Sequence, residues 1–137
     1  MRRKFVIGLA VLGSTLSAPA GAESSGTFNL TLVVPVDCTL RHSSEGVGAV
    51  SGNAFALGQI NEYCNAPAGY QIVVNYTPGT LEGTVLSAGE DQVVLNGSGR
   101  AILTNAPGPR IRARTLMATP GEHGFDTDHL DFQIQPV

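Results

Sequence analysis

The chain carries one especially regular stretch near its start, Thr27-Phe-Asn-Leu-Thr-Leu-Val-Val-Pro-Val36. Polar residues, among them Asn29 and Thr31, alternate there with apolar ones, which is the period of two that a half-buried β-strand requires. This alternation predicts an extended segment and not a helix. The apolar members are Phe28, Leu30, Leu32, Val34 and Val36.

The same period recurs along the rest of the chain, whereas helical periodicity is missing from every stretch longer than a few residues. Turn residues such as Pro78-Gly79, Asn96-Gly97 and Pro120-Gly121 separate the alternating runs. Short strands punctuated in this way predict an all-β sandwich in one domain. The strands are expected at residues 54–60, 70–76, 92–95, 101–104, 110–117 and 130–135.

Residues 1–22 have the three parts of a cleavable signal peptide. Arg2, Arg3 and Lys4 give a positive start, an apolar run follows, and small residues around Ala20 and Ala22 end it. The apolar run is much shorter than the roughly 20 residues that span a bilayer. We therefore expect an exported protein that has no membrane span once the signal is removed.

Charge and composition narrow the classes of partner. Removal of residues 1–22 leaves five arginines against 11 acidic residues, a net charge of −6. This balance argues against nucleic acid or an anionic membrane as the partner. It suits a soluble periplasmic or surface protein.

The two cysteines, Cys38 and Cys64, are expected to form one disulfide, because an even pair in an exported protein is normally oxidised. Closing a loop of about 27 residues would stabilise the fold by roughly 3–4 kcal/mol in the chain-entropy model. Neither cysteine has a second cysteine or a histidine at the spacing of a zinc site.

Candidate chemistry is sparse, so we expect neither an enzyme nor a cofactor. The densest polar cluster contains His123, Asp126, Asp128 and His129, which suits a solvated loop better than a metal site. Three arginines, Arg110, Arg112 and Arg114, share one face of an expected strand, and a solvated face is the simplest interpretation. No motif resembles a nucleophile elbow.

Three features together resemble the spore-coat-protein-U-like domains and the archaic class of chaperone–usher pilins. The first is the segment that starts at Glu23 and reaches Cys38, with its alternating apolar residues. The second is Cys64 followed by the β-rich run at residues 70–76. The third is the close of the chain, Gly124-Phe-Asp-Thr-Asp-His-Leu-Asp-Phe-Gln-Ile134.

The resemblance implies an immunoglobulin-like sandwich that is incomplete, with six strands plus an N-terminal donor strand. In such pilins, residues 1–22 would be the signal, 23–36 the donor extension and 37–137 the pilin domain. The extension of one subunit would fill a groove in the next, after a periplasmic chaperone and an outer-membrane usher have handled the subunit. The resemblance assigns Phe28, Leu30, Leu32 and Val34 to the donor strand, and Leu130, Phe132 and Ile134 to the final strand of the acceptor groove.

The function implied is a structural subunit of a surface pilus or fimbria for cell adhesion, made of identical or related subunits joined head to tail. The alternative is a free-standing periplasmic or secreted β-sandwich that acts as a binding or accessory domain. In that case residues 27–36 would form the first strand of a complete, monomeric sandwich. The alternating pattern alone fits both.

Overall fold

The computed structural model describes residues 26–50, 52–126 and 130–137, so the signal peptide expected at 1–22 lies outside the described part. The chain divides by its contacts into two units, Met1–Leu32 and Val33–Val137. The described residues contain nine strands and no helix, and all nine strands belong to the second unit. The all-β prediction is therefore confirmed.

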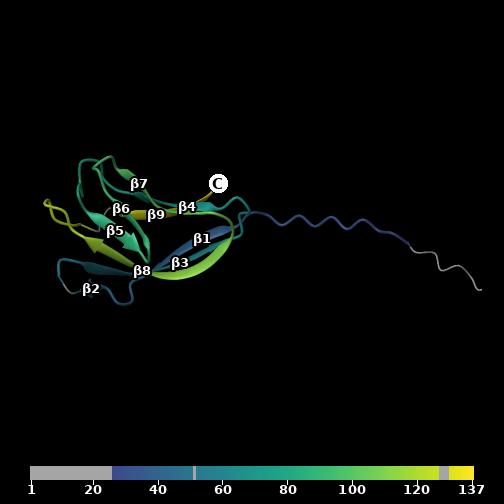
Figure 1. Ribbon diagram of the computed structural model, residues 1–137, viewed down its shortest axis with the longest axis horizontal. Coiled ribbons are helices and arrows are strands. Elements are labelled where there is room, and N and C mark those ends of the chain that lie inside the picture. Colours follow the sequence, from purple (N-terminus) through teal and green to yellow (C-terminus); the bar gives the residue numbers. More distant parts are fainter. Residues whose placement is uncertain (1–25, 51, 127–129) are drawn as a thin grey trace, which may run out of the picture. The chain divides into compact units, whose positions relative to one another are not determined.

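Two antiparallel sheets form the second unit. One has six strands in the order β1-β3-β8-β5-β6, with β2 paired to the first residues of β3, and the other has the order β7-β4-β9. Figure 1 shows the two layers, with β1, β3 and β8 in one and β7, β4 and β9 in the other. The strands are β1 (Cys38–Ser43), β2 (Gly48–Ala49), β3 (Phe55–Cys64), β4 (Tyr70–Asn75), β5 (Val85–Ala88), β6 (Asp91–Val94), β7 (Arg100–Ala106), β8 (Arg110–Thr119) and β9 (Asp131–Pro136).

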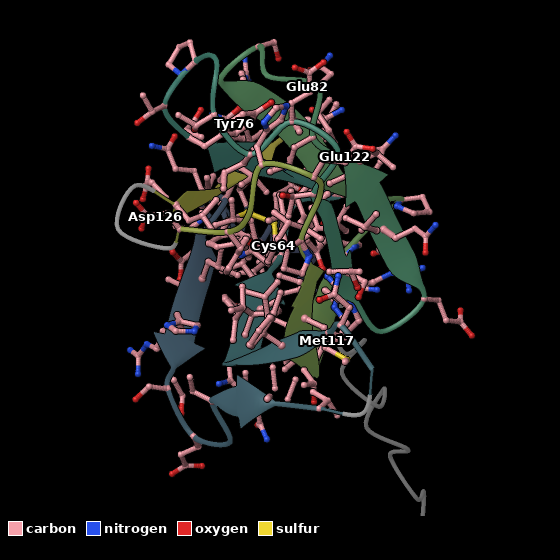
Figure 2. The ribbon with its side chains drawn as sticks, turned by 90° about the vertical axis from the view of Figure 1, so that its left-hand side faces the viewer. Cys64, Tyr76, Glu82, Met117, Glu122 and Asp126 are labelled. Carbon is pink, nitrogen blue, oxygen red and sulfur yellow. A yellow bond between two sulfur atoms is a disulfide. The ribbon has the colours of Figure 1, made fainter. Side chains whose placement is uncertain are left out.

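The core lies between the inner faces of the two sheets (Figure 2). Alternate residues of β3 and β8, such as Ile60 and Leu116, point inward and are buried. β4 pairs on both of its edges, and its apolar run is almost continuous because Ile72, Val73 and Val74 are all fully buried.

β3 bends where its pairing with β8 shifts register, between Ala56 and Gly58. Gly58 has a φ of 101° there, and a Cβ atom built on it would lie 2.1 Å from the carbonyl oxygen of Ser43. Only glycine fits this combination of positive φ and close backbone approach. The bulge divides β3 into a part that pairs with β2 and a part that pairs with β1.

The described residues contain nine strands, three more than the six expected beside a donor strand. The alternating pattern missed β1, β2 and β5, because β1 mixes charged and apolar residues and the other two strands are short. Residues 26–37 form no strand, although polar and apolar residues alternate from Thr27 to Leu32. Strand formation therefore does not follow from the pattern alone, because a strand also needs a neighbour to pair with.

Candidate functional site

The side chains of residues 27–36 are exposed. Phe28 is 85% exposed, Leu30 82% and Leu32 80%, and the exposed fraction is still 66% at Val34. Exposing several large apolar residues in one short segment is unfavourable in water, and such a surface usually marks an interaction site. The predicted donor residues are therefore available to a partner in the described structure.

A groove of about 450 Å³ lies between β1 and β9 on one open side of the sandwich. Leu40 and His42 contribute to it from β1, Phe132 from β9, and Leu130 from the position directly before β9. Its other lining residues are Val47, Leu57, Ile60, Leu116 and Asp131. Of the three residues assigned to the final strand of the acceptor groove, Leu130 and Phe132 line this groove, whereas Ile134 packs against the core farther along β9.

The strands on this side of the sandwich have unpaired edges. Within the described residues, β1 pairs only with β3 and β9 pairs only with β4, so each strand leaves one row of backbone groups without a ladder partner. An unpaired edge is a template for a further strand. Apolar lining and free backbone groups together are what an added β-strand needs.

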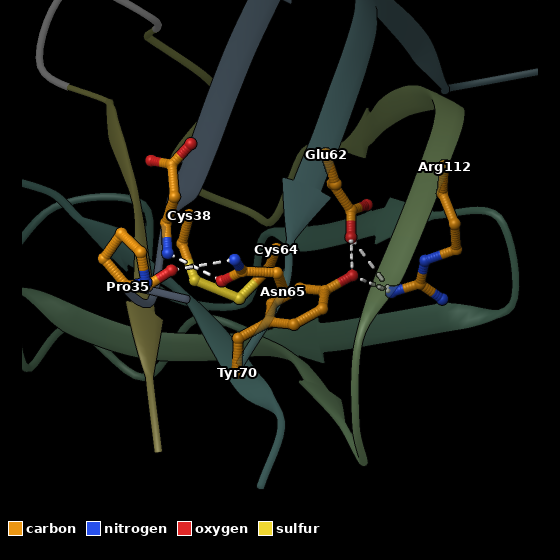
Figure 3. Close-up of a disulfide and its surroundings, with 8 residues drawn as sticks. Pro35, Cys38, Glu62, Cys64, Asn65, Tyr70 and Arg112 are labelled. Carbon is orange, nitrogen blue, oxygen red and sulfur yellow. Dashed lines mark hydrogen bonds and ion pairs between the residues drawn. A yellow bond between two sulfur atoms is a disulfide. The ribbon is translucent and has the colours of Figure 1, made fainter. Parts of the chain in front are cut away.

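Figure 3 shows the disulfide and the hydrogen bonds that hold the chain where β1 begins. Cys38 and Cys64 lie directly opposite each other in the β1–β3 ladder and form a disulfide with an S–S distance of 2.06 Å. One residue farther on, the Asn65 side chain accepts from the Asp37 amide at 2.6 Å and donates to the Pro35 carbonyl at 2.9 Å. The disulfide predicted from sequence is confirmed.

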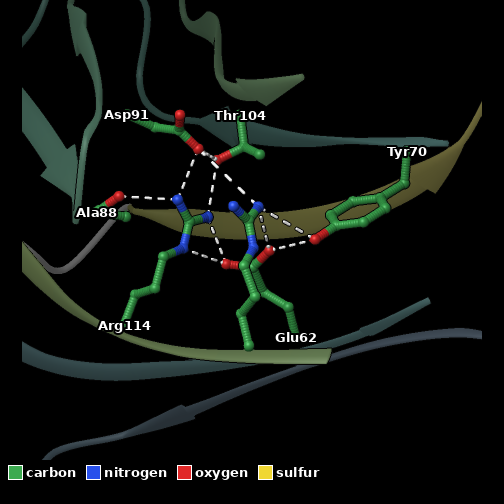
Figure 4. A network of polar contacts seen from close by, with 7 residues as sticks. Glu62, Tyr70, Ala88, Asp91, Thr104 and Arg114 are labelled. Atoms are coloured by element: carbon green, nitrogen blue, oxygen red, sulfur yellow. Dashed lines mark hydrogen bonds and ion pairs between the residues drawn. The ribbon is translucent and has the colours of Figure 1, made fainter. Parts of the chain in front are cut away.

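A network of ion pairs joins the sheets toward the other open side, where β6 and β7 lie side by side (Figure 4). Glu62 of β3 is fully buried at its side chain and bonds both Arg112 and Arg114 of β8. Arg114 Nη1 also lies 2.6 Å from Asp91 of β6, and Thr104 of β7 donates to the same Asp91 oxygen at 2.8 Å. Charged groups thus connect both edge strands on this side.

The expectation of a solvated arginine face is wrong for Arg112 and Arg114. Their side chains point toward the core face of β8, because they alternate with exposed Ile111 and continue the inward series that leads to Leu116. The Arg114 side chain is only 9% exposed. No sequence signal pointed to Glu62, whose buried carboxylate lies far away in the chain but on the paired strand β3, and compensates both arginines.

The network shifts the pKa values of three of its members. Burial and a 2.6 Å hydrogen bond to Glu62 raise the pKa of the Tyr70 hydroxyl above its usual value. Burial acts to raise the pKa of Asp91, but hydrogen bonds from Thr104 and Arg114 outweigh it and the pKa falls. Burial also opposes the charge of Arg112, yet its contacts with Tyr70 and Glu62 leave its pKa raised.

The polar cluster near the end of the chain is only partly within the described residues. His123 and Asp126 lie beside a shallow hollow with Gly79 and Leu81, while Asp128 and His129 lie outside the described part. Residues 26–50, 52–126 and 130–137 contain no group of three or more side chains arranged to hold a metal ion.

Comparison with protein-family models, curated proteins and solved structures finds no match to this chain. In the part of the chain that the structure describes, no helix is long and apolar enough to cross a membrane.

Proposed function

We propose that this protein is a structural subunit of a surface pilus, in which residues 27–36 of one copy complete the sandwich of the next. One observation carries the proposal: the chain has both an exposed alternating apolar segment and an apolar groove between two unpaired strand edges. The two features are complementary in chemistry. Because the donor segment and the acceptor groove are made of different residues, the contact is head to tail and propagates as a fibre.

The strand order supports an immunoglobulin-like interpretation of the sandwich. In that interpretation β1, β3, β8 and β5 form one sheet, β4 and β9 belong to the other, and the missing seventh strand would pair with the free edge of β9. A donor strand would occupy that position. The sandwich expected from the pilin resemblance is incomplete on this same edge.

The donor segment is long enough to lie along β9, and burying its apolar side chains is favourable. A ten-residue strand spans about 33 Å, which exceeds the roughly 20 Å of the six residues of β9. Burying the side chains of Phe28, Leu30, Leu32 and Val34 contributes on the order of 6–12 kcal/mol before the cost of ordering the segment. The backbone hydrogen bonds of the added strand stabilise the contact as well.

An exposed apolar segment and an open groove need protection before assembly. In the proposed function a periplasmic chaperone fills the groove first, and an outer-membrane usher exchanges it for the next subunit's donor segment. The protein would therefore pass through the periplasm and act at the cell surface. No cofactor takes part.

The test is a pair of substitutions in the mature chain. Leu32→Asp places a charge where an apolar side chain enters the groove, and we expect it to stop polymer growth, because an unpaired buried charge costs several kcal/mol. Thr31→Asp is the matched control, since Thr31 lies on the opposite face of the same segment and its variant is expected to polymerise. Size-exclusion chromatography and electron microscopy of refolded protein report both results.

A second arm uses a variant that starts at Pro35. Supplied with a peptide of residues 27–36, it is expected to bind the peptide but to remain a single subunit. If the wild-type chain instead stays a stable monomer and Leu32→Asp unfolds it, the proposal fails. The free-standing periplasmic binding or accessory domain would then be the better interpretation.

A further inference from the structure

Asn65 holds residues 35–37, which directly precede β1, in an extended conformation. Its amide donates to the Asp37 carbonyl at 3.1 Å, which continues the β1–β3 ladder one pair beyond the disulfide. Its side chain then bonds the Asp37 amide and the Pro35 carbonyl, as Figure 3 shows. Three hydrogen bonds to one residue therefore fix the direction of the chain at residues 35–37.

The direction of the chain at residues 35–37 determines whether the donor segment can enter the groove of its own subunit. β9 ends opposite Tyr70, close to the disulfide at which β1 begins, so β1 and β9 run in opposite directions along the open side. The groove is lined by the later residues of β1, Leu40 and His42, by Leu130 directly before β9, and by Phe132 of β9. It therefore extends away from Pro35.

A segment that filled the groove of its own subunit would have to reverse at residues 35–37 and run back beside β1. Such a reversal is a three-residue hairpin loop, a length that chains commonly adopt. It is incompatible with the extended ladder at Asp37 and with the two side-chain bonds of Asn65. Insertion into the same subunit therefore has to break these bonds, whereas insertion into another subunit leaves them intact.

We infer that Asn65 is a positioning residue that keeps the donor segment out of its own subunit's groove and directs it to a second copy of the chain. The inference rests on the proposed function. In this inference, the contacts of Asn65 disfavour a monomer that fills its own groove and favour addition to a polymer. The Cys38–Cys64 disulfide assists by fixing β1 against β3 at the same point.

The test is Asn65→Ala in the full mature chain, refolded from denaturant over a range of concentrations. We expect the ratio of monomer to polymer to rise roughly tenfold, the size expected from losing two backbone hydrogen bonds. Hydrogen exchange should show the amides of residues 28–34 protected in the monomer fraction, because the segment then occupies its own groove. Simple destabilisation would lower this protection instead of raising it.

Asn65→Asp is the second variant, because it preserves shape but cannot donate to the Pro35 carbonyl, and it should shift the ratio in the same direction. Asn61→Ala is the matched control, since Asn61 is exposed on β3, the strand that ends directly before Asn65, and lies opposite Arg41 in the ladder. It should polymerise as the wild type does.

The outcomes separate the two claims. If the wild type polymerises and both Asn65 variants polymerise equally well, the role of Asn65 is disproved and the proposed function stands. If the variants give monomers whose residues 28–34 exchange freely, Asn65 serves stability and not direction, and the inference also fails. If the wild type itself never polymerises at any concentration, the proposed function fails first.

Discussion

The two open sides of the sandwich are built differently. On the side of β6 and β7, Asp91 and Thr104 bond each other and join Arg114, so the sheets are connected through charged groups. On the side of β1 and β9, the space between the sheets is an apolar groove with unpaired strand edges. Buried ion pairs restrict geometry more than they add stability, whereas an apolar groove gains free energy when it is filled. The comparison teaches that charged groups join the sheets on one side, whereas the other side keeps an apolar groove between unpaired edges, which is what the proposed function requires.

Removing the charge of Glu62 is expected to give the largest loss. Glu62→Gln leaves Arg112 and Arg114 in the interior without their shared carboxylate, so the free energy of unfolding should fall by about 3–5 kcal/mol. Urea denaturation measures the loss. Glu45→Gln is the control, since Glu45 is exposed and its variant should match the wild type. A Glu62→Gln variant as stable as that control would show that the charged side contributes little to closure.

Loss of the disulfide should come next. Cys38→Ser releases the start of β1 from β3 and should lower the free energy of unfolding by about 2–4 kcal/mol. Urea denaturation without reductant compares the variant with the wild type. The wild type in reductant is the control and should lose a similar amount. Equal stability of oxidised and reduced wild type would contradict this expectation.

Phe132→Ala tests the apolar side. Phe132 is partly buried against the core in the isolated domain, so the variant should lose about 2–3 kcal/mol of its own stability. Its affinity for a peptide of residues 27–36 should fall at least roughly tenfold, since the peptide would bury the rest of the ring. Isothermal titration calorimetry gives the affinity. Gln133→Ala changes an exposed neighbour on the same strand, and equal affinities for the two variants would place the donor site elsewhere.

The smallest effect concerns pH. The pKa of Asp91 is lowered in the folded protein, so its contribution is present above the unfolded value near 3.9 and is lost as the pH falls through the folded value. Because the Asp91 side chain is 35% exposed, the loss should be under about 1 kcal/mol. Thermal unfolding between pH 5 and pH 2 should show a shallower slope for Asp91→Asn than for the wild type. Identical slopes would remove Asp91 from the acid response.

The sequence predicts the all-β class and the disulfide because both follow from local rules. Alternation and turn residues specify strands such as β4 and β9, and an oxidised pair needs only two cysteines in an exported chain. The pattern does not reveal which runs have a pairing partner. Polar and apolar residues alternate from Thr27 to Leu32 and form no strand, whereas β1 alternates poorly and is held by β3 and the disulfide.

The buried network was not predictable for a related reason. Arg112 and Arg114 follow the period of a solvated face, and only the pairing of β3 with β8 brings Glu62 opposite Arg112. Asn65 likewise looks like an ordinary turn residue after Cys64 until the backbone at residues 35–37 lies beside it. Contacts between positions far apart in the sequence decide both roles, and local rules carry no information about them.

The ultraviolet absorbance of Tyr70 depends on the state of the charged network in the interior. The chain has three tyrosines and no tryptophan, so tyrosine dominates its near-ultraviolet absorbance. The Tyr70 hydroxyl donates to Glu62 and accepts from Arg112, and its raised pKa means that it resists ionisation while the network is intact. The part of the tyrosinate band that Tyr70 contributes would therefore rise, without any label, only when the interface between the two sheets opens.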